Sequence, residues 1–400
     1  MKQLISSFLF IPFGLLLQAQ EISDTKFGNG MINFIAKDSS FSVKFAPRIQ
    51  SRYQSEWSYN GEDYDPADIN FSVRRARLKF GGFAFSPKLK YKIELGLSNR
   101  DISGANVYNR NTPRYILDAV VMWNFHENFE LWAGQTKLPG NIERVVSSAN
   151  LQLIDRSLLN SKFNIDRDMG IQLRHKLRLG GNWIIKEKFS ISQGEGRNIT
   201  EGNIGGLQYT SRLELLPFGE FSSKGDYSQG DLKREKSIKA MFGFTYDINE
   251  NAVKSRSNMG SYLIQSSGGL FETDITTIFL DGVIKYNGFA LTGEYANRDA
   301  DQIEALEEDG RTKTGAVVGA GSASNIQGSY LFKNNFEITA RYTNINFKEI
   351  TRLSDLKQIT FGVSKYVVGH SLKIQADISL LNASGIKDNV LFRTGFDLHF

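Results

Sequence analysis

The sequence predicts an all-β protein, a transmembrane antiparallel β-barrel of about 16 strands. Three observations lead to this fold class. Apolar and polar residues alternate with a period of two in segment after segment, many segments run to about ten residues or more, and tight turns alternate with long polar connections. A soluble β-sandwich also alternates, but its strands average about five or six residues, which is too short to cross hydrocarbon.

The composition is typical of strands and turns. Among 400 residues, 37 are Gly and 12% are aromatic, whereas only 7 are Pro. The chain contains no Cys, which excludes a disulfide framework. No later segment approaches about 18 uninterrupted apolar residues, so we expect no transmembrane helix. The net charge of +5 is mild, and only its placement can indicate a partner.

The N-terminus has the pattern of a secretory signal peptide. A basic residue, an apolar run too short to span a bilayer and a small polar tail follow one another. We expect cleavage after Ala19. The predicted organisation is a signal peptide over 1–19, an N-terminal periplasmic segment over 20–39 and a β-barrel domain over 40–400.

The alternation places each strand of this barrel in turn. In the last strand, Phe392 and Phe396 fall on one face, whereas Arg393 and Asp397 fall on the other. The same test along the chain predicts strands near 40–57, 70–85, 88–101, 114–125, 129–138, 164–179, 181–194, 205–218, 237–248, 272–287, 289–298, 324–333, 335–347, 356–367, 370–382 and 389–400.

The connections between the strands differ in length on the two sides of the barrel. Tight turns such as Asn287-Gly288 and Gly369 alternate with long polar loops such as 58–69 and 299–323. Short turns at one rim and long loops at the other are typical of outer-membrane barrels. Residues 219–236 are long on the short-turn side, and we expect a disordered or plugging turn there.

The alternation of side chains between the two faces of each strand, which we call strand parity, predicts a basic lining in the first part of the barrel. If apolar side chains face lipid, charged ones face the lumen, because a cation facing lipid at mid-membrane costs about 2–4 kcal/mol. Arg and Lys along a pore favour anions, since low-dielectric walls focus their field. Inward charges after about residue 237 come closer to cancelling. The predicted pathway cations are Arg48, Arg52, Arg75, Arg77, Lys92 and Arg174, with Glu94 and Asp118 among the few acids on the same faces.

The third long connection, 139–163, is unusually apolar. Side chains such as Leu153 and Leu159 would be unfavourable in a loop surrounded by water. We predict that this inward-folded third loop packs on the barrel wall and presents Arg144 and Arg156 to the channel as a constriction. The alternative is an outer loop that packs on neighbouring loops or on another subunit.

Several stretches resemble the phosphate-selective porin O and P family. The resemblance implies a sixteen-strand outer-membrane porin, usually trimeric, in which an arginine ladder and an inward-folded third loop pass phosphate or polyphosphate. The stretches are Phe71-Ser-Val-Arg-Arg-Ala-Arg-Leu78, Leu117-Asp-Ala119, Gly134-Gln-Thr-Lys-Leu-Pro-Gly140 with Glu143, and Asp155-Arg156-Ser157.

The resemblance also assigns roles to single residues. It matches the paired arginines of the family's second strand to Arg74 and Arg75, and the acid of its fourth strand to Asp118. The family's third loop carries a lysine that is associated with phosphate binding. Here residues 139–161 contain Arg144 and Arg156 but no lysine.

The sequence therefore predicts an outer-membrane porin of a Gram-negative bacterium that forms a water-filled channel for inorganic anions, with phosphate or polyphosphate as the expected solute. We expect contacts with outer-membrane lipid and lipopolysaccharide, a homotrimer and no nucleic-acid partner. None of the four His is placed for Ser–His catalysis, because strand alternation puts His175 toward lipid and the others lie at turns or at the chain end. There is no Cys and no cluster of His, so we expect no enzyme activity, cofactor or metal. The alternatives are a general, sugar or peptide porin without anion specificity, or a plugged barrel that acts as an adhesin.

Overall fold

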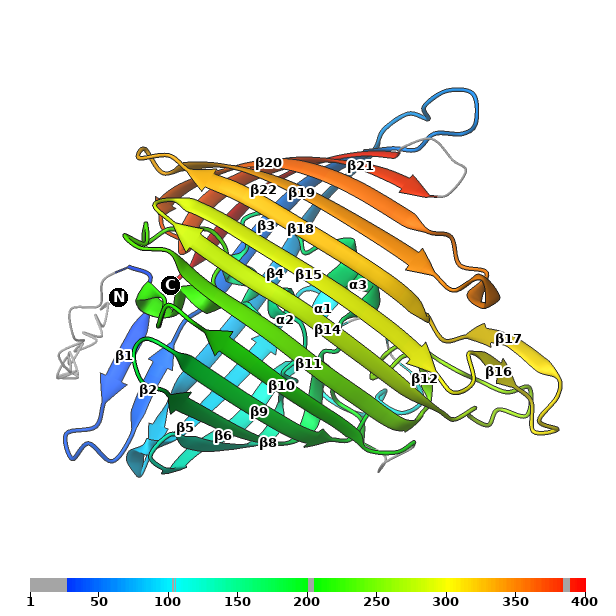
Figure 1. The fold of residues 1–400 in the computed structure, drawn as a ribbon, viewed down its shortest axis with the longest axis horizontal. Helices are drawn as coiled ribbons and strands as arrows, with labels where there is room; N and C mark the ends of the chain where they lie inside the picture. The colour runs from blue at the N-terminus through cyan, green and yellow to red at the C-terminus, as the bar shows by residue number, and fades with distance from the viewer. Residues whose placement is uncertain (1–26, 103, 105, 201–204, 384–388) are drawn as a thin grey trace, which may run out of the picture.

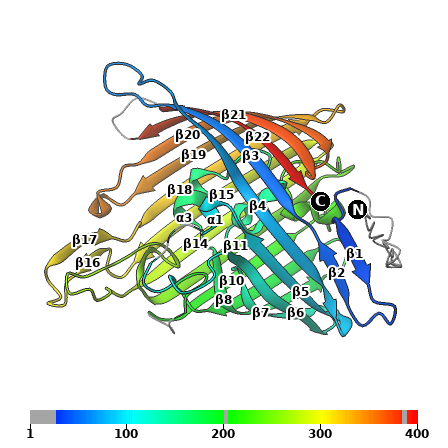
Figure 2. The ribbon, with the colours of Figure 1, turned by 180° about the vertical axis from the view of Figure 1, so that it is seen from behind.

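The computed structural model describes residues 27–102, 104, 106–200, 205–383 and 389–400, and the predicted signal peptide lies outside them. Within this part of the chain, sixteen strands form a closed antiparallel barrel, which Figures 1 and 2 show from opposite sides. Each strand pairs with the next, and β22 pairs with β3 to close the barrel. The barrel strands are β3 (Arg48–Trp57), β4 (Asp68–Ala84), β5 (Ser86–Gly96), β6 (Ile116–His126), β7 (Phe129–Lys137), β8 (Arg167–Arg178), β9 (Ile184–Ser192), β10 (Gln208–Leu216), β11 (Lys239–Ala252), β14 (Thr273–Tyr286), β15 (Phe289–Ala300), β18 (Gly321–Leu331), β19 (Phe336–Phe347), β20 (Leu356–Val368), β21 (Leu372–Ala383) and β22 (Asn389–His399).

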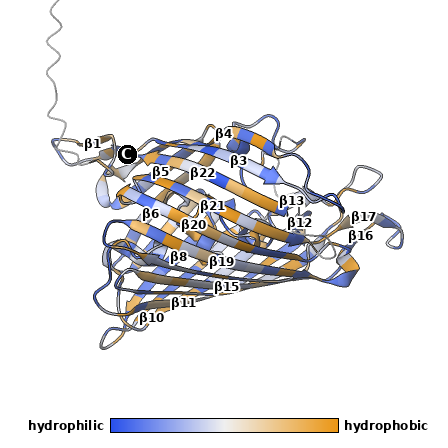
Figure 3. Cartoon of the chain, turned by 90° about the horizontal axis from the view of Figure 1, so that it is seen from above, coloured by the Kyte–Doolittle hydropathy of each residue, from blue (hydrophilic) through white to orange (hydrophobic). Residues whose placement is uncertain are grey.

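Each predicted strand has a counterpart in the barrel, and the fold class is confirmed. The reason is the two-residue period, which places apolar side chains on the outer face. Phe396 is 43% exposed on that face, whereas its neighbour Asp397 is 1% exposed on the inner face. Figure 3 shows the resulting alternation of hydrophobic and hydrophilic residues along the strands.

The short turns agree with the predicted turn chemistry. Asn287 and Gly288 connect β14 to β15, and both have positive φ, at 47° and 91°. A two-residue hairpin with positive φ at both positions favours the Asn-Gly sequence, because Gly lacks a Cβ and Asn tolerates this region.

Several smaller elements lie outside the sixteen barrel strands. The hairpin of β1 and β2 extends the sheet beside β4, and β1 lies in the segment 20–39, where no strand was predicted. Two further hairpins form within long loops. None of the helices in the described residues is long and apolar enough to cross a membrane. The bounds are β1 (Ile32–Ile35), β2 (Ser42–Phe45), β12 (Lys254–Arg256), β13 (Met259–Tyr262), β16 (Glu304–Leu306), β17 (Lys313–Val317), α1 (Asn99–Ile102), α2 (Ile142–Val145), α3 (Leu158–Phe163), and the 3-10 helices η1 (Ser148–Asn150), η2 (Ser222–Tyr227) and η3 (Glu349–Thr351).

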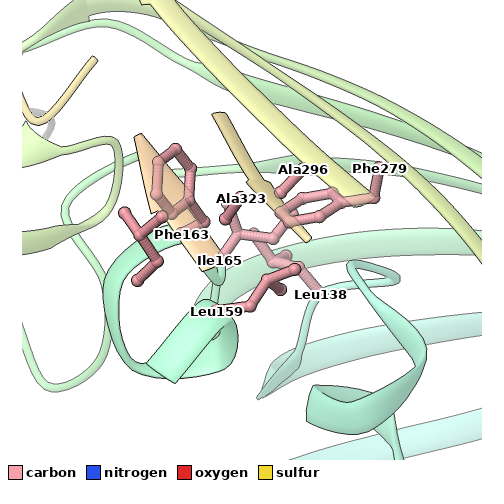
Figure 4. Packing of buried hydrophobic residues seen from close by; sticks show 8 residues of the cluster. Leu138, Leu159, Phe163, Ile165, Phe279, Ala296 and Ala323 are labelled. Atoms are coloured by element: carbon pink, nitrogen blue, oxygen red, sulfur yellow. The ribbon is translucent and has the colours of Figure 1, made fainter. Parts of the chain in front are cut away.

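Residues 138–166, which we call the long-loop segment, connect β7 to β8 and contain α2, η1 and α3. The side chain of Ser157 caps α3 by accepting a hydrogen bond from the amide of Asn160. The apolar side chains of the segment pack on side chains from four barrel strands, and Figure 4 shows this cluster. Its members are Leu138, Leu159, Phe163 and Ile165 from the segment, with Phe279, Ala296, Ala323 and Ile345 from β14, β15, β18 and β19.

Residues 217–238, which we call the long turn, connect β10 to β11 and are ordered around η2. Lys285 of β14 donates hydrogen bonds from Nζ to the carbonyl groups of Gly225, Ser228 and Gly230. The amide of Gln229 donates to the carbonyl of Asn150 in the long-loop segment, at 2.9 Å. The long turn therefore packs against the barrel and the long-loop segment and is not disordered, while the alternative expectation of a plugging turn stays a prediction.

Candidate functional site

A cavity of about 1180 Å³ opens between the long-loop segment and the long loops at the same end of the barrel. Among the described residues that line it, basic side chains outnumber acidic ones by fifteen to four. The acids are Asp101, Asp155, Asp166 and Glu195. The basic residues are Arg52, Arg74, Arg75, Arg77, Arg100, Arg114, Arg144, Arg156, Lys162, Arg167, Arg197, Lys254, Arg256, Arg341 and Arg393.

An irregularity in β4 brings two consecutive arginines to the inner face. The register between β3 and β4 shifts where Gln50 pairs with Arg75 and Ser51 pairs with Val73, so that Arg74 is an extra residue in β4. A bulge of this kind changes the direction of the side chains next to it. Both Arg74 and Arg75 are buried and both contact Asp155. Parity alone had assigned only Arg75 to the lumen, and the bulge corrects that assignment.

Asp155 of the long-loop segment forms ion pairs with four arginines. Arg74 donates to its Oδ1 from Nη2 at 2.5 Å, and Arg75 donates to the same oxygen at 3.3 Å. Arg52 and Arg393 approach its Oδ2 at 2.8 and 3.5 Å. Burial acts to raise the pKa of the Asp155 carboxyl, but the charges of Arg74, Arg75 and Arg393 lower it well below its usual range.

A second network runs across β4, β5, β6 and β8. Arg77 donates to Glu94 at 2.9 Å, and Lys92 donates to Asp118 at 2.6 Å. Arg167 also donates to Asp118, at 2.9 Å from Nε. Glu94 and Asp118 are almost fully buried, whereas the side chain of Lys92 remains 38% exposed. The predicted lumen acids therefore neutralise part of the cationic charge on this wall.

Three of the predicted pathway cations have different surroundings. Arg52 lines the cavity. Arg174 lies over the ring of Trp132, with Cζ at 3.6 Å from the ring centroid, and donates to Gln172. Arg48 is inward but only 1% exposed.

The surroundings of Arg48 correct its predicted role. It pairs with Asp397 at 2.6 Å and donates from Nη1 to the hydroxyl of Ser148, at 2.7 Å. Because both ends of its guanidinium are engaged with buried groups, Arg48 attaches the long-loop segment to the wall and does not face the cavity.

Both predicted loop arginines line the cavity, but each is also engaged within the long-loop segment. Arg144 pairs with Asp166. Arg156 donates to the carbonyl groups of Glu143 and Val146, each at 2.7 Å. These contacts fold the segment back on itself and leave the guanidinium groups at the cavity surface.

The inward charges of β14 to β21 bind the backbone of the long-loop segment. Asp281 accepts from the amide of Ile142 at 3.2 Å, and Glu294 accepts from the amide of Glu143 at 2.7 Å. Lys373 of β21 donates to the carbonyl groups of Ala149 and Leu151, at 2.9 and 2.6 Å. Buried backbone groups need such partners, and here side chains of the barrel supply them.

The cavity contains residues that were not among the predicted pathway or loop cations. Asp155, Arg393 and Arg167 come from three separate elements, and no periodic pattern connects them. The family resemblance had pointed to Arg74 and to the Asp155-Arg156-Ser157 stretch. The resemblance was the available signal for Arg74 and for Asp155. The two-residue alternation along a strand cannot reveal a bulge, and it does not apply to a loop.

Residues 47–380 match the family of phosphate-selective porin O and P. The chain belongs to this family. The porin is 25% identical over 358 residues to an uncharacterized protein of Aquifex aeolicus (strain VF5), a match that covers 83% of this chain and 80% of that protein.

Solved structures with the same fold include OmpT, expressed in the outer membrane of Vibrio cholerae, with a TM-score of 0.54, 10% identity and coverage of 92% of this chain and 100% of that one. They also include the anion-selective porin from Comamonas acidovorans, with a TM-score of 0.53, 14% identity and coverage of 90% and 100%. At these identities the likeness concerns the fold. Family and fold together identify an outer-membrane porin, and they point to a channel rather than an enzyme.

Proposed function

We propose that this porin conducts anions in preference to cations and that phosphate-like oxyanions are its solutes. The observation that carries the proposal is the cavity lining, in which basic side chains outnumber acidic ones by fifteen to four among the described residues. Low-dielectric walls focus the field of such a lining onto mobile ions. Arginines predominate in it, and their planar guanidinium groups bind the oxygen atoms of phosphate in pairs.

We also propose that the long-loop segment folds into the lumen and narrows it. The support is the set of hydrogen bonds from its backbone to inward side chains of β14, β15 and β21, including those to Asp281, Glu294 and Asp377. The inner face of β20 fits the same arrangement at Gly362, where a Cβ would lie 2.2 Å from Cδ2 of Leu153. The remaining pathway then runs along the wall of β4 to β8.

Reversal potentials across a planar bilayer test the proposed selectivity. Under a KCl gradient, we expect a potential near that of chloride. The double variant R114Q/K162Q should shift it toward potassium, because these two cavity residues form no ion pair with another described residue. The control K313Q/K348Q removes the same charge from exposed loop ion pairs, and it should leave the potential unchanged.

The same recordings distinguish the other functions. A wild-type potential near zero would contradict anion selectivity and favour a general or sugar porin. The absence of any current from correctly folded protein would favour a plugged barrel. The hydrogen bond from Gln229 of the long turn to Asn150 of the long-loop segment is the reason to test this alternative.

We propose further that the mature chain begins after Ala19 and assembles as a homotrimer in the outer membrane. The solved OmpT of Vibrio cholerae includes a trimer form with this fold, at 12% identity and a TM-score of 0.52. N-terminal sequencing of protein from isolated outer membranes should start at Gln20. Light scattering of the detergent-solubilised protein should give three times the protomer mass, and a protomer mass would refute the trimer.

A further inference from the structure

We propose that Asp155 is a tethered competitor for the anion site of this channel: its carboxylate occupies a cage of four arginines that a solute oxyanion enters by displacing it. The cage consists of Arg52, Arg74, Arg75 and Arg393. This inference rests on the proposed anion channel and identifies the residues that set how tightly the anion is held.

The four arginines come from adjacent strands of the barrel wall. Arg52 lies on β3, Arg74 and Arg75 lie at the bulge of β4, and Arg393 lies on β22, which closes the barrel beside β3. Ladder hydrogen bonds hold these strands together, so the backbone positions from which the four arginine side chains extend do not depend on Asp155. The wall thus provides a preformed site for an anion.

The cage has more hydrogen-bond donors than Asp155 can use. A carboxylate has about four lone-pair positions, whereas each guanidinium has five N–H groups. Within the described residues, Nε of Arg52 and Nη2 of Arg393 are buried and have no hydrogen-bond partner. Asp377 pairs with Arg393 at 2.6 Å, so two carboxylates face four guanidinium groups, and the remaining positive charge gives the cage the capacity to bind a further oxyanion.

The backbone around Asp155 is fixed independently of its carboxylate. Arg341 donates to the carbonyl of Asp155 at 3.0 Å, and Asp377 accepts from the amide of Ile154 at 3.1 Å. The carboxylate can therefore leave the cage by a change of side-chain rotamer alone, without unfolding the segment. Asp155 and all four arginines line the large cavity, so a solute anion reaches them directly.

The exchange has a physical consequence for transport. A solute oxyanion in the cavity takes over hydrogen bonds that Asp155 held, and the returning carboxylate then competes for the same donors. The competition weakens retention of the solute, and it prevents a four-arginine site from holding a multivalent anion too long for rapid passage. Asp155 is on this view a specificity-determining residue and not only a structural partner of the wall.

The test compares D155N with D166N by measuring block of chloride current by inorganic phosphate in planar bilayers. Asp166 lines the same cavity, but its contacts are with Arg144 and Arg167, outside the cage. Both variants remove one negative charge from the cavity. We expect D155N to lower the half-blocking phosphate concentration by about tenfold, equivalent to about 1.4 kcal/mol, and D166N to lower it by less than about threefold, since screened charges act weakly at a distance.

Equal effects of the two variants, or no effect of D155N, would overturn the inference. A second pair, R74Q and R256Q, applies if D155N fails to show the heat-modifiable migration of a folded barrel. Arg74 belongs to the cage, whereas Arg256 lines the cavity elsewhere. R74Q should raise the half-blocking concentration by about tenfold, against less than about threefold for R256Q, and equal shifts would again overturn the inference.

The wild-type reversal potential separates this inference from the proposed function. A wild-type channel without chloride preference contradicts the proposed function itself. A chloride-selective wild type whose phosphate block is insensitive to D155N contradicts only the role of Asp155.

Discussion

The wall formed by β3 to β8 and the wall formed by β14 to β21 both carry charged residues on their inner faces, but these residues have different partners. On the first wall, Arg77 and Lys92 pair with acids of neighbouring strands and stay close to the cavity or to solvent. On the second wall, Glu294 and Lys373 are bound to the backbone of the long-loop segment. The first wall also binds the backbone of the segment through Arg48 and Lys137, but most of its charge lies at the cavity, whereas the second wall uses its charge to hold the segment.

This difference explains why inward charges after about residue 237 come close to cancelling in the sequence. A backbone offers donors and acceptors in equal number, so a wall that binds it needs both acidic and basic side chains. A wall that lines the cavity has no such requirement, and basic side chains outnumber acidic ones in that lining among the described residues. The near-neutral wall is therefore a binding surface for the chain itself.

The largest expected effect comes from breaking the apolar contact between the long-loop segment and the second wall. Phe163 is fully buried, packs with Phe279 and stacks on Phe347 at 5.9 Å. F163A should lower the free energy of unfolding by about 3–5 kcal/mol, the usual cost of such a cavity, and should raise single-channel conductance because the segment loosens. Urea unfolding in detergent micelles and bilayer recordings measure the two effects.

A lipid-facing phenylalanine provides the control for that experiment. Phe71 is 78% exposed on the outer face of β4, so F71A should leave the conductance unchanged. If F163A also left conductance and stability unchanged, the second wall would not hold the segment.

An intermediate effect is expected at Gln152, which binds the second wall through its side chain. It donates to Glu337 at 2.7 Å and accepts from Gln327 at 2.6 Å. Q152A should cost about 1–3 kcal/mol of unfolding free energy, because buried polar partners lose their hydrogen bonds. Gln302, a partly exposed loop residue with one side-chain hydrogen bond, is the matched control. A similar cost for Q302A would indicate that burial of these contacts is unimportant.

The smallest effect on stability is expected at Arg174 on the first wall, which stacks on Trp132. R174Q should lower the unfolding free energy by less than about 1 kcal/mol, the scale of a partly solvated cation–π contact. It should also shift the reversal potential slightly toward cations. R174K keeps the charge and should restore the potential. A stability loss as large as that of F163A would remove the distinction between the two walls.

Strand alternation predicted the barrel well because each side chain in a lipid-embedded strand has only two environments. Phe392 and Arg393 differ by one position, and the cost of exposing a charge to lipid fixes which one points inward. The same reasoning predicted that Arg75 and Arg77 point inward, and both line the cavity, but it missed Arg74. A bulge adds one residue without changing composition or hydropathy, so a strict two-residue count cannot detect it.

The candidate site was harder to predict than the fold, because its residues meet only when distant elements come together. Arg48 has the parity of a pathway cation, yet Asp397 and Ser148 enclose it. Asp155 lies outside any strand and belongs to no periodic pattern, yet it contacts arginines from three strands. Partners separated by more than two hundred residues in sequence, such as Asp155 and Arg393, leave no local signal.

The amino-acid sequence by itself determined the number and order of the strands, the side of each strand that faces lipid, and the rim at which the long loops lie, because these follow from local periodicity and turn chemistry. Tertiary structure alone decided which charged side chains lie at the cavity and which bind residues 138–166. That choice depends on distances between groups far apart in the chain, and electrostatic and hydrogen-bond energies are set by those distances.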